Sequence, residues 1–185
     1  MTTKPGKMAE REPLSVAVIG AGIAGLTAAC FLRKHHKVTI YEKGGPSATT
    51  GGQGIATFPN AARILNKIGF DRRRAGSVPI RHFRSYDKHG KLSHDPKINY
   101  LERYGENLFT HFRSDLQAEL LRLATTSLED ADTDGEPAAI NFNTLVEDID
   151  PIEGHLILGN GSRVVADLII GSLLYSIVLE LERAK

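Results

Sequence analysis

The sequence has 185 residues, of which 41% are hydrophobic and 24% are charged, the proportions of a globular protein. Lysine and arginine total 23 and aspartate and glutamate 22, so a formal net charge of +1 gives no electrostatic reason to expect a nucleic-acid or anionic-membrane partner. The one cysteine, Cys30, excludes an internal disulfide framework and a cysteine-rich zinc site. It lies in a helical apolar pattern, which predicts a buried residue and not a reactive thiol.

Both ends of the sequence bear on where the protein works. Residues 1–13 are polar and lack the apolar core of a secretory signal, so we expect a disordered lead-in. The uncharged stretch at residues 168–179 is shorter than the roughly 20 residues that a membrane-spanning helix needs. We therefore expect a cytoplasmic protein without a membrane span.

The first elements form a strand, a helix and a second strand. Residues 15–19 (SVAVI) are a short apolar run that leads into glycine, as buried parallel strands do. Residues 24–34 have apolar residues at helical spacing, and residues 37–41 predict another strand. Such a unit has parallel strands and a right-handed crossover. The fold class that this predicts is α/β with a parallel sheet.

The turn between the first strand and the helix has the pattern G-x-G-x-x-G at Gly20, Gly22 and Gly25. The first glycine allows a tight turn, the second lets backbone approach a pyrophosphate, and the third lets the helix pack close to the strand. The N–H groups that begin the helix, at Ile23 and Ala24, would face the diphosphate. The alternative is a glycine turn that only packs tightly.

An acidic residue ends the second strand. Glu42 follows Gly20 by 22 residues, and a carboxylate there can accept hydrogen bonds from the ribose hydroxyls of an adenosine. It would disfavour a 2′-phosphate, so the site suits FAD or NAD and not NADP. The adjacent Lys43 is either solvated or in contact with the adenosine.

The middle of the chain departs from regular strand–helix alternation. A glycine-rich loop at residues 44–54 precedes a helix that Pro59 and Asn60 open and Gly69 ends. Residues 80–86 alternate in polarity, and the turn DKHG leads to a return strand near residues 91–92.

The later elements are a helix and several short strands. A capping box of Ser114 and Gln117 predicts a helix to about residue 125. Short strands follow the acidic loop at residues 127–137, and the last of them covers residues 163–171, RVVADLIIG. The GNG turn at residues 159–161 makes that strand the second half of a hairpin.

Together these segments resemble the FAD-dependent aromatic hydroxylases, the salicylate hydroxylase-like class A flavoprotein monooxygenases. The matching segments are VAVIGAGIAGLTAACFLRKHHKVTIYEK, GGQGIATFPNAARILNKIGF, HFRSDLQAELL and ADLIIG. The resemblance implies a Rossmann-like FAD-binding domain with an antiparallel β insert. It also implies FAD as cofactor, NAD(P)H as co-substrate, and a small aromatic-type substrate hydroxylated with O₂.

Carried over to this sequence, the resemblance implies a site made from two groups of residues. Gly20, Gly22, Ile23, Ala24, Gly25, Glu42 and Lys43 would hold the ADP part. Gly54 and Ile55 match positions where backbone runs along the cofactor, and Arg113 matches an FAD-contacting arginine. The alternatives are an ordinary loop glycine at Gly54 and a surface salt bridge from Arg113 to Asp115 or Glu119.

After Gly171 the sequence departs from the family, whose strand runs into Gly-Ala-Asp-Gly. Leu173 and Leu174 stand where the aspartate and glycine would be. We therefore expect an incomplete FAD-binding domain at residues 14–171 and a divergent tail at residues 172–185. The hypothesis is a truncated form, a splice product or a gene prediction that ran into the wrong frame.

Other arrangements leave open what the chain does. The adjacent His35 and His36 diverge on a helix and make a poor metal pair. Arg72–Arg74 are expected on a solvated surface, with a nucleic-acid or phosphate contact as the alternative. No catalytic acid or base, metal site or oligomeric state is assigned. Besides an active monooxygenase, a non-catalytic flavin-binding fragment and another FAD-dependent oxidoreductase remain. Of the last class, a disulfide reductase lacks its cysteine pair, and an amine oxidase fits the middle segments poorly.

Overall fold

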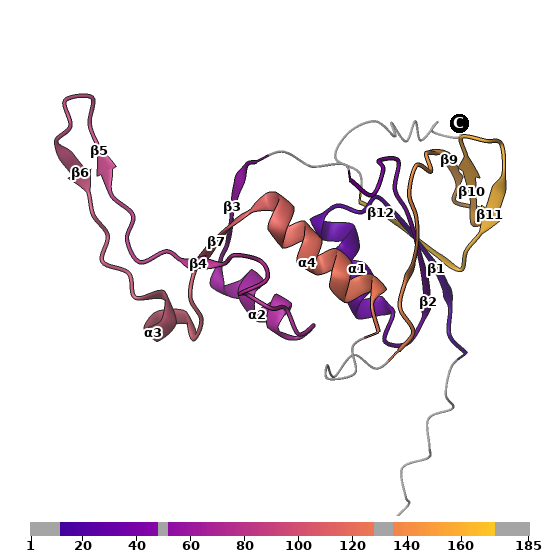
Figure 1. Cartoon of the computed structure of the whole chain (residues 1–185), viewed down its shortest axis with the longest axis horizontal. Helices are drawn as coiled ribbons and strands as arrows, with labels where there is room; N and C mark the ends of the chain where they lie inside the picture. The colour runs from indigo at the N-terminus through magenta and orange to yellow at the C-terminus, as the bar shows by residue number, and fades with distance from the viewer. Residues whose placement is uncertain (1–11, 48–51, 128–134, 173–185) are drawn as a thin grey trace, which may run out of the picture.

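A computed structural model describes residues 12–47, 52–127 and 135–172. At its centre lies a four-stranded parallel sheet in the order β12-β1-β2-β8 (Figure 1). Its strands are β1 (Ser15–Ile19), β2 (Lys37–Tyr41), β8 (Ala139–Asn141) and β12 (Leu168–Gly171). The expected α/β fold with a parallel sheet is confirmed.

Strand β1 is buried on both faces, because a layer covers each side of the sheet. Val16 and Val18 face the helices, while Ala17 and Ile19 face a second, antiparallel sheet, since side chains alternate along a strand. A strand that is covered on both faces has no side facing solvent, and this is why its sequence is a continuous apolar run and does not alternate with polar residues.

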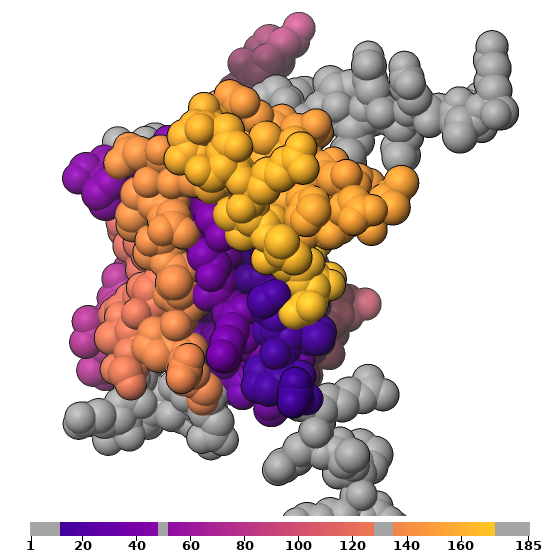
Figure 2. Space-filling view, turned by 90° about the vertical axis from the view of Figure 1, so that its right-hand side faces the viewer, coloured from indigo at the N-terminus to yellow at the C-terminus, as the bar shows by residue number. Residues whose placement is uncertain are grey.

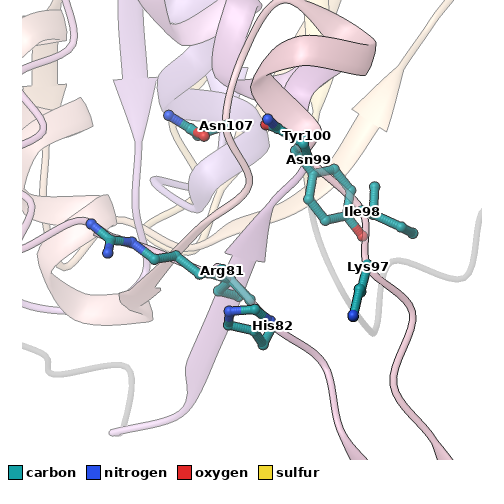
Figure 3. A pocket seen from close by; sticks show the side chains of 8 residues that line it. Arg81, His82, Lys97, Ile98, Asn99, Tyr100 and Asn107 are labelled. Atoms are coloured by element: carbon teal, nitrogen blue, oxygen red, sulfur yellow. The ribbon is translucent and has the colours of Figure 1, made fainter.

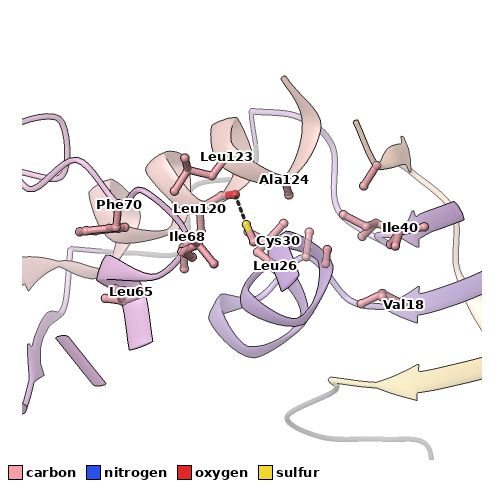
Figure 4. Packing of buried hydrophobic residues seen from close by; sticks show 14 of the residues in the cluster. Val18, Leu26, Cys30, Ile40, Leu65, Ile68, Phe70, Leu120, Leu123 and Ala124 are labelled. Carbon is pink, nitrogen blue, oxygen red and sulfur yellow. Dashed lines mark hydrogen bonds between the residues drawn. The ribbon is translucent and has the colours of Figure 1, made fainter. Parts of the chain in front are cut away.

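Helices α1 (Ile23–Leu32) and α4 (Arg113–Thr125) pack side by side on one face of the sheet (Figure 4). Their contact buries Leu26 and Cys30 against Leu120 and Leu123. The Cys30 thiol donates to the Leu120 carbonyl at 3.5 Å, and burial raises the pKa of this thiol to about 12. The expectation of a buried cysteine is confirmed.

A buried arginine fastens the end of α1 to the end of α4. Arg33 is 2% exposed, and its guanidinium donates to the carbonyls of Leu123, Thr126 (3.0 Å) and Glu136 (3.1 Å). Burial lowers the pKa of Arg33. The carbonyl groups that a helix C-terminus leaves without partners thereby gain a cationic donor.

A small antiparallel sheet in the order β3-β7-β4 lies beyond the helices. It comprises β3 (Gly54–Thr57), β7 (Phe109–Phe112) and β4 (Val78–Pro79), next to helix α2 (Pro59–Asn66). Pro59 begins α2 as expected, but the helix ends at Asn66, and turns continue from there to Gly69. The buried His111 ties this region together, with Thr57 Oγ1 2.9 Å from Nε2 and Ser77 Oγ 3.0 Å from Nδ1.

Residues 80–107 are called the arm here; the arm extends away from the molecule and its end returns to it, where Glu106 pairs with Arg72 (Figure 1). The arm holds a hairpin of β5 (Ser85–Tyr86) and β6 (Leu92–His94) and the short helix α3 (Tyr100–Tyr104). None of its residues is buried. The expected hairpin is present, but residues 80–84 form no strand. Their polarity alternates as in a strand, but they pair with no other strand in the described ranges.

The second antiparallel sheet, in the order β11-β10-β9, covers the other face of the parallel sheet (Figure 2). Its strands are β9 (Val146–Asp150), β10 (His155–Leu158) and β11 (Arg163–Val165). The GNG hairpin between β10 and β11 is confirmed. The single strand expected at residues 163–171 is wrong, because the chain changes sheet between β11 and β12.

Two other expectations are corrected by tertiary contacts. Arg72 is not solvated like its neighbours, because it pairs with Glu106 at 2.7 Å and lies over the ring of Phe109. Helix α4 begins at Arg113 with no side-chain cap, so the expected capping box is wrong; Ser114 Oγ bonds Asp115 instead. Across the described ranges, no helix combines the length and apolar character needed to cross a bilayer.

Candidate dinucleotide-binding site

The candidate site begins at the carboxyl end of β1, where the chain turns into α1. Gly20 has a φ of +96°, a left-handed value that glycine adopts without steric cost, and its N–H donates to the Tyr41 carbonyl at 2.8 Å. The turn is therefore fixed to the neighbouring strand β2. The role expected for Gly20, a tight exit from the strand, is confirmed.

Gly25 is required by close packing. A Cβ atom there would lie 2.2 Å from the Gly20 carbonyl oxygen and 2.5 Å from Ser172 Oγ. Both distances are far inside van der Waals contact, so only glycine lets α1 approach the turn this closely. At Gly22 the nearest atom to an added Cβ is the Ser172 carbonyl oxygen at 4.0 Å, so the protein itself leaves that position open.

The start of α1 presents backbone donors at the turn. The first N–H in the helical ladder is that of Leu26, which donates to the Gly22 carbonyl at 2.9 Å. The N–H groups of Ile23, Ala24 and Gly25 precede it and lack partners within the ladder. These groups and the positive end of the helix dipole suit a phosphate group.

Glu42 is held at the turn by two backbone donors. Its Oε2 accepts from the Ala21 N–H at 2.6 Å, and its Oε1 accepts from the Gly44 N–H at 2.7 Å. A carboxylate offers about four acceptor positions, so each oxygen keeps one for a further donor. The half-buried carboxylate is thus oriented and still able to accept two hydroxyl groups, whereas Lys43 beside it is exposed.

The second group of expected residues lies where β3 meets the start of α4. Gly54 pairs with Phe112, and the Arg113 N–H donates to the Gln53 carbonyl at 2.9 Å. Gly54 is exposed and has open space where a Cβ would project, while Ile55 packs against the main core. The structure therefore brings Gly54, Ile55 and Arg113 together.

The alternative salt bridge for Arg113 does not form. Glu119 pairs with Arg122 at 2.7 Å, and Asp115 accepts from Ser114. Within the described ranges Arg113 has no ion pair, and its side chain is half-buried.

Two residues at the turn were not expected from the sequence. Gln117 Nε2 donates to the Ala21 carbonyl at 2.6 Å, and Ser172 Oγ donates to the Gly20 carbonyl at 3.0 Å. Gln117 lies four residues after Arg113, a spacing that places both residues on one face of the helix. This spacing could have indicated a shared role, but the sequence pattern also fits a capping box, and Gln117 was assigned to that. Ser172 follows Gly171, which pairs with Ile19 at the end of the sheet.

Other residues of the predicted site lie outside the described ranges. Leu173 and Leu174, which stand in place of the family's aspartate and glycine, belong to that part, as do residues 48–51 of the glycine-rich loop. The described ranges contain no group of three or more metal-ligating side chains.

A pocket of about 360 Å³ lies at the root of the arm, apart from the glycine turn (Figure 3). Its lining includes Arg81, His82, Lys97 and Tyr100. The cationic ends of Arg81 and Lys97 point in different directions in Figure 3, and both side chains are exposed. The pocket therefore lacks converging polar groups and is assigned no role.

Comparison with known proteins gives a consistent assignment. The family described as FAD dependent oxidoreductase matches residues 15–82. Hispidin-3-hydroxylase from Neonothopanus nambi is 33% identical over 161 residues, which cover 86% of this chain and 37% of that protein.

Solved structures give the same result. That of 2-methyl-3-hydroxypyridine-5-carboxylic acid oxygenase aligns with a TM-score of 0.68 at 27% identity, over 85% of this chain and 38% of that one. CtdE in complex with FAD and substrate 4 aligns with a TM-score of 0.67 at 26% identity, over 85% of this chain and 37% of that one. The chain thus spans somewhat more than a third of the length of these relatives. By sequence and fold, it belongs to the family of FAD-dependent monooxygenases.

Proposed function

We propose that this chain binds FAD and forms the cofactor-binding part of a monooxygenase that hydroxylates a small aromatic molecule with NAD(P)H and O₂. The observation that carries the proposal is the pairing of the Gly20–Gly22 turn with the oriented Glu42 carboxylate. The oxygenase named after a hydroxypyridine carboxylic acid supports an aromatic-type substrate.

In this proposal, different residues of the chain bind different parts of the cofactor. The N–H groups at the start of α1 face the diphosphate, and Glu42 accepts hydrogen bonds from the ribose hydroxyls. Arg113 supplies a fixed cationic donor on the flavin side, beside the backbone at Gly54 and Ile55. The bound cofactor supplies the redox chemistry, while the protein binds, orients and shields it.

The fit can be argued from atoms of this chain. Both Glu42 oxygens keep one acceptor position, which matches the two hydroxyls of a ribose. A phosphate on one of those hydroxyls would place a second negative charge beside the carboxylate. The site therefore favours FAD over a 2′-phosphorylated dinucleotide at this position.

The test is to purify the full chain, look for bound yellow flavin, and measure FAD affinity by fluorescence quenching. Glu42→Ala should weaken FAD binding by about 100-fold, because two hydrogen bonds to a charged acceptor are lost. Glu42→Gln, which keeps one acceptor oxygen, should lose less.

Glu153→Ala removes an exposed carboxylate far from the turn in sequence and serves as the control. Folded wild-type chain that takes up no FAD would overturn the proposal. NAD(P)H oxidation with aromatic substrates is measured separately; flavin binding without turnover would favour the non-catalytic flavin-binding fragment.

A further inference from the structure

The peptide groups of the glycine turn are held by side chains from separate elements. Glu42, just after β2, accepts from the Ala21 N–H, and Gln117 on α4 donates to the Ala21 carbonyl at 2.6 Å. At the preceding residue, Ser172 after β12 donates to the Gly20 carbonyl. Of these three contacts, the one from Gln117 joins the turn to the helix that carries Arg113.

Gln117 and Arg113 share one face of α4. They are four residues apart, and a rise of about 1.5 Å per residue separates them by about 6 Å along the helix axis. Gln117 therefore adds a direct polar contact between the turn and the face of α4 that carries Arg113, beside the apolar packing of α1 against α4.

We propose that Gln117 is a positioning residue that sets the spacing between the dinucleotide turn and Arg113. The inference rests on the proposed function, because it concerns how the two halves of an FAD molecule are held at once. The phosphate and ribose contacts lie at the turn and Glu42, while the flavin side meets Arg113.

The apolar core of the helix pair does not include this contact. Leu116, Leu120 and Leu123 on α4 are each at most 1% exposed and belong to the core cluster that contains Leu26 and Cys30. Gln117 is only half-buried beside them. Loss of its donor should therefore change alignment at the site much more than folding.

The experiment compares FAD with ADP as ligands of the full chain. Gln117→Met keeps length and neutrality but removes the donor. FAD affinity should fall about tenfold, the order of one hydrogen bond, because the alignment that this bond maintains is lost. ADP, which engages only the turn and Glu42, should bind within about twofold of wild type, since the other turn contacts remain.

Thr125→Val is the matched control. Thr125 Oγ1 donates to the Leu121 carbonyl at 2.8 Å near the other end of the same helix, and valine removes that bond with little change of shape. This variant should bind both ligands like wild type. Thermal unfolding of all three proteins without ligand shows whether each is folded.

The outcomes separate the inference from the proposed function. If folded wild-type protein binds no FAD, the proposed function fails and the inference fails with it. If wild type binds FAD and Gln117→Met binds it equally well, only the inference is overturned. Equal losses for FAD and ADP would also overturn it, because Gln117 would then only shape the turn.

Discussion

The body of the molecule, meaning the described residues outside the arm, differs from the arm in how far its residues are buried. In the body, the parallel sheet is covered on one face by α1 and α4 and on the other by β9–β11, and β1 is almost wholly buried. In the arm, no residue is buried, and large apolar side chains such as Phe83, Tyr86 and Leu92 are exposed. The candidate site lies in the body, where close packing holds side chains in fixed positions.

The largest expected effect is a substitution at Gly25 in the body. Gly25→Ala should destabilise the chain by about 3 kcal/mol or more, because the new Cβ meets the Gly20 carbonyl and Ser172 at 2.2 and 2.5 Å. Urea denaturation followed by circular dichroism measures it. Gly52→Ala is the control, since no atom lies within 4 Å of a Cβ there. Equal stability of the two variants would show that the turn can open and that the body is less rigid than described.

An intermediate effect on stability is expected from the titration of His111, which lies in the small sheet that joins the arm to the body. Burial chiefly, with Arg72 adding to it, lowers the pKa of His111 below its ordinary 6.5, against an opposing hydrogen bond with the Ala75 backbone. The unfolded chain therefore binds more protons than the folded chain between the lowered pKa and 6.5. The neutral His111 therefore contributes its full stabilisation above pH 6.5. This contribution to the free energy of unfolding is lost as the pH falls from 6.5 through the pKa of the folded state.

This loss should not exceed about 1.4 kcal/mol per pH unit for one proton. Urea midpoints at about pH 7.5 and about pH 5.5 measure it, the range in which histidine titrates. His111→Gln, which cannot titrate, should show a smaller difference between the two midpoints. A difference that is the same in both proteins would assign the pH dependence to other groups.

The smallest effect is expected from shortening the arm. Replacing residues 83–95 with a short glycine–serine linker removes the hairpin without touching the buried core. The free energy of unfolding should change by less than about 0.5 kcal/mol, as for surface changes in general. FAD affinity should stay as in wild type. A large loss of either would mean that the arm and the body form one cooperative unit.

The sequence by itself determined the local parts of this protein. The glycine spacing at Gly20, Gly22 and Gly25, the apolar run of β1 and the acidic Glu42 each follow from short-range rules, because backbone conformation and strand polarity are set within a few residues. The order of the segments was enough to indicate the family.

Tertiary structure alone decided which distant groups meet. It gave Gln117 the Ala21 carbonyl in place of a capping role, placed Ser172 against Gly20, and divided residues 163–171 between two sheets. These contacts join residues up to 152 positions apart. No local pattern encodes such pairings, since they depend on how the sheets and helices pack once each has formed.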